Sequence, residues 1–370
     1  MPSDKPRVVV AMSGGVDSSV TAALLKQQGY TVIGMMLRLW NEPGAESYNR
    51  CCTPDAMAQA RRVAALLDIP FYAVDGQEAF YQQVVTPFLE GYTQGITPNP
   101  CAFCNRHVRW EFLLERALAL GAEFMATGHY VRLQRAADGQ AHLRRALDTR
   151  KDQSYILHVL DQAQLKHALF PLGEFTKPQV RQMARDLNLP VSERSDSQDL
   201  CFLGQSDLRG FLQQHAPGSM QPGPIIDRQG RLLGQHQGLA SYTIGQRKGL
   251  GIAAPQPLYV LEKRLPTNTL VVGEQSELGQ SGLVTHPMRW IAGSPPPTPL
   301  RAALKIRSTA PLAPAWLDLL PDGGLQARCD RPLRDITPGQ SAVVYLEDEV
   351  LGGGVIKSAG NGSSSDREIL

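Results

Sequence analysis

The sequence predicts an α/β protein in which an N-terminal doubly wound parallel sheet is followed by two smaller β-rich parts. Over the first half of the chain, short apolar runs alternate with segments of helical periodicity. After Cys201, and most clearly from residue 217, Gly, Pro and Gln become frequent and the apolar runs shorten. Beyond about residue 278, alternating segments such as 301–307 and 342–346 are typical of a small antiparallel barrel.

Length and composition agree with this division. A chain of 370 residues is long enough for two or three cores. We expect an α/β domain at 1–207, a β-rich middle domain at 208–277, a C-terminal β-barrel at 278–357 and a disordered polar tail at 358–370. The net charge of +2 permits a nucleic-acid partner but does not argue for one. Without a membrane span or a signal-peptide core, the chain is expected to be cytoplasmic.

The first strand, 8–11, ends at the pair Gly14 and Gly15, and the apolar positions of 20–25 then predict a helix. A second strand at 31–37 and a third at 69–74 are separated by a loop at 41–52 and by a helix that Thr53 caps. Further helices are expected at 78–91, 105–120 and 208–214, and also from about residue 154 and after Thr176. A strand is expected at 123–130 and another at 223–227, and a hairpin is expected at 131–145 around Asp138.

The turn after the first strand is a candidate phosphate cradle. Two glycines allow a ligand to approach the backbone closely, and Ser13, Ser18 and Ser19 add hydroxyl donors at a helix start. The spacing and the missing Gly-Lys-Ser/Thr ending exclude a Walker P-loop. A plain strand-to-helix turn is the alternative, and the full Ser-Gly-Gly-Val-Asp-Ser-Ser string argues against it.

The six cysteines of a cytoplasmic chain indicate thiols, metal ligands or catalysts rather than a disulfide framework. Cys101 and Cys104 form a Cys-x-x-Cys motif at a helix start, which is compatible with zinc, with a redox disulfide or with an iron–sulfur centre. Cys201 lies in a polar segment and is a third candidate. The adjacent Cys51 and Cys52 are interpreted as structural or incidental.

Six motifs occur in one order along the chain. They are Ser-Gly-Gly-Val-Asp-Ser at 13–18, Thr-Pro-Asn-Pro-x-x-x-Cys at 97–104, Thr-Gly-His-Tyr at 127–130, Lys-Asp-Gln-Ser-Tyr at 151–155, Ser-Gln-Asp-x-Cys-Phe at 197–202 and Tyr-Thr-Ile-Gly-Gln-Arg-Lys-Gly-Leu at 242–250. The first resembles the pyrophosphate-binding loop of the N-type ATP pyrophosphatases (the PP-loop class), which have an adenine nucleotide alpha hydrolase-like fold. Together, the motifs resemble the bacterial tRNA-specific 2-thiouridylases of the MnmA type, over about residues 8–356.

The resemblance implies a set of roles. ATP, with Mg²⁺ near Asp17, would be bound by Ala11, Met12, Ser13, Gly14, Gly15, Val16, Asp17, Ser18, Leu37 and Gly128. The target uridine would meet Asn99, Pro100 and Cys101. Transfer RNA would contact His129, Lys151, Asp152, Gln153, Arg307, Ser308 and Gln340, with further phosphate contacts at Arg247 or Lys248. Cys104 would be the nucleophile, and Cys201 would carry a persulfide.

By the same resemblance, the substrate would be the wobble uridine of Lys, Glu and Gln tRNAs. A cysteine desulfurase or a sulfur relay protein would supply the sulfur. ATP would adenylate the C2 oxygen and make AMP the leaving group. The persulfide sulfur on Cys201 would attack C2 directly, or would first be released as hydrosulfide by Cys104. The base would leave the anticodon stack to react.

The sequence is also compatible with other kinds of protein. Many relatives carry Asp at the position of Cys101, and Cys101, Cys104 and Cys201 could instead ligate a [4Fe–4S] cluster; we favour the catalytic thiol pair. The chain could also be another PP-loop enzyme that forms amides, which would not need the cysteines. It could lastly be a non-catalytic RNA-binding or iron–sulfur protein, which would release no pyrophosphate.

Overall fold

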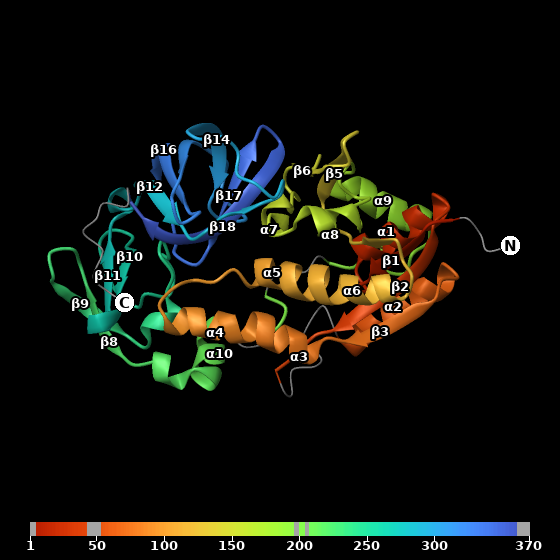
Figure 1. The fold of residues 1–370 in the computed structure, drawn as a ribbon. Helices are drawn as coiled ribbons and strands as arrows, with labels where there is room; N and C mark the ends of the chain where they lie inside the picture. Colours follow the sequence, from red (N-terminus) through yellow and green to blue (C-terminus); the bar gives the residue numbers. More distant parts are fainter. Residues whose placement is uncertain (1–4, 43–52, 196–199, 204–206, 361–370) are drawn as a thin grey trace.

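The computed structural model describes residues 5–42, 53–195, 200–203 and 207–360. Its first sheet has the order β3-β2-β1-β4-β7, and every neighbouring pair is parallel (Figure 1). The strands are β1 (Arg7–Ala11), β2 (Thr31–Arg38), β3 (Phe71–Asp75), β4 (Phe124–Ala126) and β7 (Ala168–Leu169). The expected parallel sheet is confirmed. Strand β4 is shorter than the expected 123–130, and β3 begins only after Pro70, which has no N–H to donate.

Helices cover both faces of this sheet. One face packs against α1 (Val16–Gln27), α2 (Pro54–Leu66) and α9 (Lys177–Asp186). The other face packs against the long helix of residues 100–119 and against α7 (Ser154–Leu157) and α8 (Gln162–Lys166). Alternate residues of β1 serve the two cores, with Val9 on one side and Val8 and Val10 on the other. The doubly wound arrangement is therefore confirmed.

Local signals explain the helix starts. Thr53 caps α2, and its hydroxyl accepts a 2.9 Å bond from the Ala56 N–H. The helix expected at 105–120 begins earlier, at Pro100, because Asn99 caps it by accepting from the Ala102 N–H at 3.2 Å. It runs as α5 (Pro100–Phe103), a π-helical segment η2 (Cys104–Leu113) and α6 (Leu114–Ala119), one continuous ribbon in Figure 1. The cysteine pair thus lies inside the helix and not before it.

The helix expected at 78–91 also contains a π segment. It consists of α3 (Gln77–Phe80), η1 (Tyr81–Val85) and α4 (Thr86–Thr93). Helix α10 (Leu208–His215) lies where 208–214 was expected, and its Phe211 and Leu212 share a core with η1 and α4. Short 3₁₀ turns are found at Pro217–Ser219, Leu239–Ser241, Leu265–Thr267 and Gln275–Glu277.

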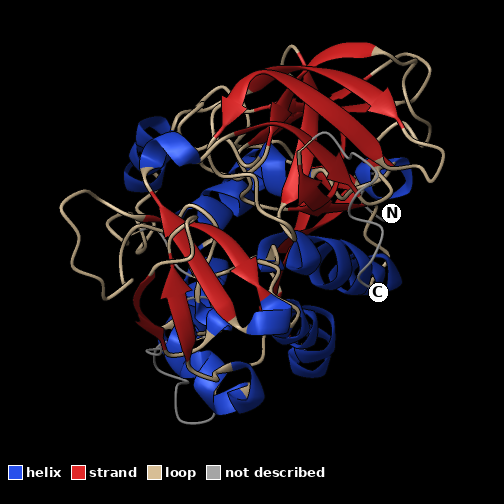
Figure 2. Ribbon diagram, turned by 90° about the vertical axis from the view of Figure 1, so that its left-hand side faces the viewer, coloured by secondary structure: helices blue, strands red, loops and turns tan. Residues whose placement is uncertain are grey.

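The remaining strands form two β-rich bodies, which Figure 2 shows as separate groups. The middle sheet has the order β10-β11-β8-β9, with β8 (Gly223–Ile226), β9 (Leu232–His236), β10 (Tyr259–Arg264) and β11 (Thr269–Gly273). The barrel runs β12-β16-β15-β14-β17-β18 and closes through antiparallel pairing of β12 with β18, as the sequence predicts. Its strands are β12 (Gln280–Thr285), β14 (Leu300–Lys305), β15 (Ala313–Leu319), β16 (Leu325–Leu333), β17 (Ser341–Leu346) and β18 (Glu349–Ala359), and β13 (Arg289–Trp290) pairs with β18.

The hairpin expected at 131–145 is present as β5 (Val131–Arg135) and β6 (Ala141–Arg145), and it extends the barrel sheet through a pairing of Arg144 with Glu349. Several expectations fall outside the described residues: most of the 41–52 loop with Cys51 and Cys52, positions 196–199 beside Cys201, and 361–370 of the tail. Within the described part of the chain, no helix is long and apolar enough to cross a bilayer.

Candidate active site

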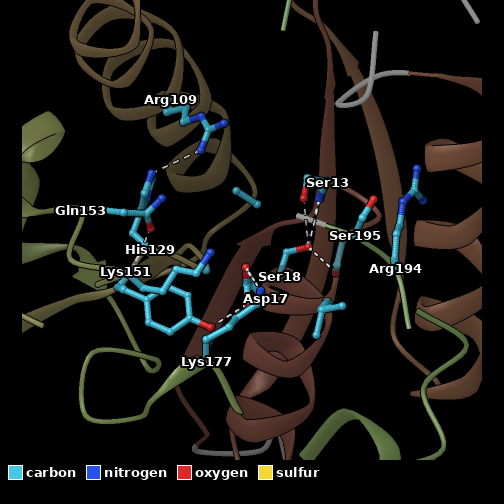
Figure 3. A pocket seen from close by; sticks show the side chains of 15 residues that line it. Ser13, Asp17, Ser18, Arg109, His129, Lys151, Gln153, Lys177, Arg194 and Ser195 are labelled. Carbon is cyan, nitrogen blue, oxygen red and sulfur yellow. Dashed lines mark hydrogen bonds and ion pairs between the residues drawn. The ribbon is translucent and has the colours of Figure 1, made fainter. Parts of the chain in front are cut away.

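A cavity of about 250 Å³ opens at the carboxyl end of β1, where doubly wound sheets bind ligands. Figure 3 shows Arg109, His129, Lys151 and Gln153 along one side and Arg194 and Ser195 along the other, with Ser13, Asp17 and Ser18 between them. The lining residues are Ala11, Ser13, Gly15, Val16, Asp17, Ser18, Arg109, Gly128, His129, Tyr130, Lys151, Gln153, Lys177, Arg194 and Ser195.

The loop between β1 and α1 has the geometry of an anion cradle. Gly14 has φ +70°, and a Cβ there would lie 2.2 Å from the Ala56 carbonyl oxygen, so only glycine fits. The Ser13 N–H donates to Ser18 Oγ at 3.2 Å, and Ser18 Oγ donates to the Gly15 carbonyl at 3.2 Å. These bonds fix the shape of the loop, and the N-terminus of the twelve-residue helix α1 lines the cavity.

Asp17 is held by two residues that sequence reasoning missed. Lys177 Nζ donates to both carboxylate oxygens, at 2.7 and 2.8 Å, and the Tyr130 hydroxyl donates to one of them at 2.8 Å. The Lys177 side chain is only 9% exposed. Opposite, Arg194 donates to the Gly14 carbonyl at 3.1 Å and pairs with Asp55 at 3.1 Å. In the sequence, Lys177 follows a recognisable cap, but no motif marks it or Arg194 as cavity residues.

His129 forms part of the cavity wall, and burial holds it neutral. Its side chain is among the buried residues, with Nδ1 2.7 Å from Thr127 Oγ1 and Nε2 3.5 Å from Arg109 Nη1. Burial, and secondarily the charge of Arg109, lower the pKa of His129 to about 3. Since the guanidinium can only donate, Nε2 accepts, and Nδ1 carries the hydrogen that bonds to Thr127.

Two buried imidazoles predict a pH-dependent stability. The pKa of His129 is about 3 and that of His158, also lowered chiefly by burial, is about 4. In the unfolded chain, these histidines take up protons below about pH 6.5, whereas in the folded chain they do so only at a lower pH. Their contribution to the free energy of unfolding is therefore fully present above about pH 6.5 and is lost as the pH falls. We expect the melting temperature to drop between about pH 7 and about pH 5.

An asparagine variant separates the loss of stability caused by protonation of a buried histidine from the loss caused by protonation of carboxylates. His158 Nδ1 lies 2.7 Å from the Tyr155 carbonyl oxygen, and an Asn side-chain amide can make the same donation without titrating. The drop in melting temperature should be smaller in His158→Asn than in the parent protein. The exposed His286→Asn should behave like the parent. Equal drops in all three proteins would contradict the assignment.

Cys104 and Cys201, which belong to two different motifs, lie at one apolar cluster. Cys101 is exposed on α5, whereas Cys104 is buried at the start of η2. The half-buried Cys201 packs against the cluster that contains Cys104. Its neighbour Phe202 is the anchor, because its ring packs against Phe88 with a centroid separation of 5.0 Å. Cys104 belongs to the same cluster as Phe202 and Phe88, so the segment of Cys201 and the start of η2 share one core.

The structure does not support the iron–sulfur alternative. Within the described residues, no three His, Cys, Asp or Glu side chains are grouped so that they could hold a metal ion. No chemical step is therefore assigned to a [4Fe–4S] cluster on Cys101, Cys104 and Cys201. Mg²⁺ would enter with ATP, bound mainly by its phosphates, and Asp17 is the carboxylate nearest to the cradle among the residues that line the cavity.

Several residues expected to contact ligands form bonds within the protein, and their ligand contacts stay predictions. The Asp152 carboxylate is 1% exposed and accepts bonds from Ser154 and Arg145. Gln340, in the barrel, donates to the carbonyls of Thr97 and Pro98 at 3.0 and 3.1 Å. The other expected residues do not line the cavity: Met12 and Gly14 in the cradle loop, Leu37 on β2, Asn99, Pro100 and Cys101 on α5 and its cap, and Arg307 and the exposed Ser308 on the barrel.

Arg307 and Asn99 likewise join the domains. Arg307 donates to the Ile244 carbonyl at 2.9 Å and to the Thr337 hydroxyl. Asn99 Nδ2 lies 3.4 Å from Ser341 Oγ. The barrel segment 337–341 therefore holds the loop that precedes the cysteine pair, which the sequence did not indicate.

The parallel sheet and the Ser-Gly-Gly-Val-Asp-Ser turn at the end of its central strand define a PP-loop ATP-binding domain. Three family models match the chain: the tRNA methyl transferase HUP domain over residues 6–205, the tRNA methyl transferase PRC-barrel domain over 209–274 and the aminomethyltransferase beta-barrel domain over 280–356. The chain belongs to the MnmA family of tRNA-specific 2-thiouridylases.

Curated relatives match almost the whole chain. The tRNA-specific 2-thiouridylase MnmA of Magnetococcus marinus is 48% identical over 352 residues, 95% of this chain and 98% of the relative. That of Geobacter metallireducens is 45% identical over 360 residues, 96% and 98% of the two chains. Among solved structures, the U34-tRNA thiolase NcsA from Methanococcus maripaludis with its [4Fe-4S] cluster is 22% identical with a TM-score of 0.35, covering 58% of this chain and 68% of that one. This last likeness is too slight to carry an argument.

Proposed function

We propose that this protein replaces the C2 oxygen of the tRNA wobble uridine by sulfur, at the expense of ATP. One observation supports the coupling of adenylation by ATP to the transfer of sulfur. Arg109 lines the cavity of the phosphate cradle, and it belongs to the same π-helical segment as Cys104. Residues five apart in a π-helix are about one turn apart, so the nucleophile and the ATP cavity share one rigid element.

The first step is adenylation. The uracil O2 attacks the α-phosphorus, an O–P bond forms, and the bond to the β-phosphate breaks with its electron pair on pyrophosphate, while the N3 proton passes to solvent. The cradle and Lys177 would bind the departing pyrophosphate, because backbone donors and an ammonium stabilise the charge that develops there. Asp17 would position Lys177 and face the Mg²⁺ that accompanies ATP.

Sulfur transfer follows. A sulfur atom attacks C2 and the C–O bond breaks, with AMP as the leaving group. The sulfur comes from a persulfide on Cys201, either directly or as hydrosulfide. In both routes the Cys104 thiolate breaks the S–S bond, so that a Cys104–Cys201 disulfide remains and a thiol reductant must restore the pair. A protein sulfur donor would reload Cys201 in a reducing cytoplasm, and the Lys, Glu and Gln tRNAs would be the substrates.

The decisive test is mass spectrometry of tRNA nucleosides after incubation of the purified protein with unmodified tRNA, ATP, Mg²⁺ and a cysteine desulfurase with cysteine. We expect 2-thiouridine at the wobble position, with AMP and pyrophosphate formed only when tRNA is present. Pyrophosphate formed equally well by Cys104→Ser and Cys201→Ser with a small acceptor would favour an amide-forming enzyme instead. An absence of pyrophosphate under all conditions would favour a non-catalytic RNA-binding protein.

A further inference from the structure

We propose that Arg109 is a catalytic residue that binds the α-phosphate of ATP during adenylation and keeps hold of it in the adenylated uridine. The inference rests on the proposed function. It concerns a residue outside all six sequence motifs, which the structure alone places at the cavity.

The charges around the cavity call for a polyanion. Among the described residues that line it, the cationic side chains are Arg109, Lys151, Lys177 and Arg194, against the single carboxylate of Asp17. Lys177 is bound to that carboxylate, and Arg194 reaches the Gly14 carbonyl and Asp55. An extended triphosphate chain matches a cavity with cations at both of its sides.

The position of Arg109 selects the α-phosphate. In Figure 3, Arg109 lies on the side opposite Arg194, with the cradle residues Ser13 and Ser18 between the two. The cradle at the start of α1 suits the β- and γ-phosphates, which leave together. The α-phosphate must lie toward the uridine, which reacts with the sulfur that Cys104 releases. Arg109 is on the same helical segment as Cys104, five residues after it, and so lies on the uridine side of the cradle.

The surroundings of Arg109 suit a phosphate rather than a carboxylate partner. His129 stands behind the guanidinium and is neutral, so it orients Arg109 through Nε2 without cancelling its charge. The planar guanidinium presents two parallel N–H groups, a geometry that matches two non-bridging phosphate oxygens. A negative charge grows on these oxygens as the uracil oxygen attacks, so the interaction strengthens in the transition state.

The test compares Arg109→Gln and Arg109→Lys with the parent protein and with Arg116→Gln. Arg116 lies on the same helix, bonded to the Phe112 carbonyl and outside the cavity, so it is a matched control. Single-turnover pyrophosphate release with tRNA and saturating ATP should fall about 10²- to 10³-fold in Arg109→Gln, because one donor to the developing charge is lost. Arg109→Lys should recover part of the rate, since it keeps the charge but not the paired donors.

Binding of AMP and of pyrophosphate, each measured alone, separates the α-phosphate from its neighbours. Arg109→Gln should weaken AMP binding about tenfold or more and leave pyrophosphate binding unchanged, since a lost charge-assisted hydrogen bond has a cost of that order. Equal effects on both ligands, or no effect on AMP, would overturn the proposal. These measurements do not require sulfur transfer, so a parent protein that makes no 2-thiouridine would disprove the proposed function while still deciding the role of Arg109.

Discussion

Replacing Cys201 by Ser is expected to abolish 2-thiouridine formation while tRNA-dependent pyrophosphate release in a single turnover stays within about threefold of the parent rate. A hydroxyl cannot carry a sulfane sulfur, so no persulfide forms. The adenylation machinery lies in the cavity and does not include Cys201, because that residue packs instead in the apolar cluster of Cys104 and Phe202. The measurements are nucleoside mass spectrometry and a pyrophosphate assay on the same samples.

Cys329→Ser is the matched control, because it makes the same change at a buried cysteine on β16 of the barrel. Burial raises the pKa of the Cys329 thiol, which keeps it protonated and unreactive. We expect normal 2-thiouridine yield from that variant. A normal yield of 2-thiouridine from Cys201→Ser would remove Cys201 from the mechanism. Loss of pyrophosphate release by the same variant would mean that the substitution has disturbed the ATP site.

A Cys104→Ser variant distinguishes the two routes of sulfur transfer. If the persulfide on Cys201 attacks C2 directly, the serine of this variant cannot break the S–S bond, and in a single turnover without added thiol the tRNA stays covalently bound to Cys201. If Cys104 must first release hydrosulfide, no adduct forms and the persulfide stays on Cys201, detectable as the mass of one added sulfur atom. Either outcome also tests whether Cys104 is the residue that cleaves the persulfide.

The parts of this fold that follow from sequence are those with local causes. Alternating apolar runs predict the parallel sheet, the Thr53 cap marks α2, and the glycine pair at 14–15 marks the cradle, because each signal depends on residues within a few positions. His129, Lys151 and Gln153, which the motifs predict as tRNA contacts, line the cavity, and their contact with tRNA stays a prediction.

The parts that sequence did not predict depend on distant pairings. Lys177 meets Asp17 across 160 positions, and Gln340 meets Pro98 across 242, and no periodicity encodes such contacts. Arg109 escapes prediction for a different reason: the sequence predicts a regular helix from Asn105, whereas a π-helical turn changes which residues share a face. The site is thus a motif-encoded cradle completed by Arg109, Lys177 and Arg194, whose positions only the fold determines.

Asp17→Asn is expected to lower the rate of tRNA-dependent pyrophosphate release by about 10²- to 10³-fold, a typical cost for removing one group that organises charge at a reacting phosphate. The change keeps the shape of the side chain but removes the charge that faces Lys177 Nζ at 2.7 Å and the Mg²⁺ of ATP. Asp75→Asn, at the end of strand β3 at the edge of the same sheet, neutralises an exposed carboxylate paired with Arg38 and should stay within about twofold of the parent, as surface pairs contribute little.

The mutual dependence of Asp17 and Lys177 gives the sharper test. Lys177→Met should slow pyrophosphate release about as much as Asp17→Asn, because each residue orients the other and the ammonium would meet the leaving group. If the two act as a unit, the double variant should be no slower than the slower single variant, since the second change removes an interaction already lost. Multiplying effects would instead mean that Asp17 acts through Mg²⁺ and Lys177 through phosphate, independently of each other. An Asp17→Asn variant that turns over at close to the parent rate would exclude Asp17 from catalysis.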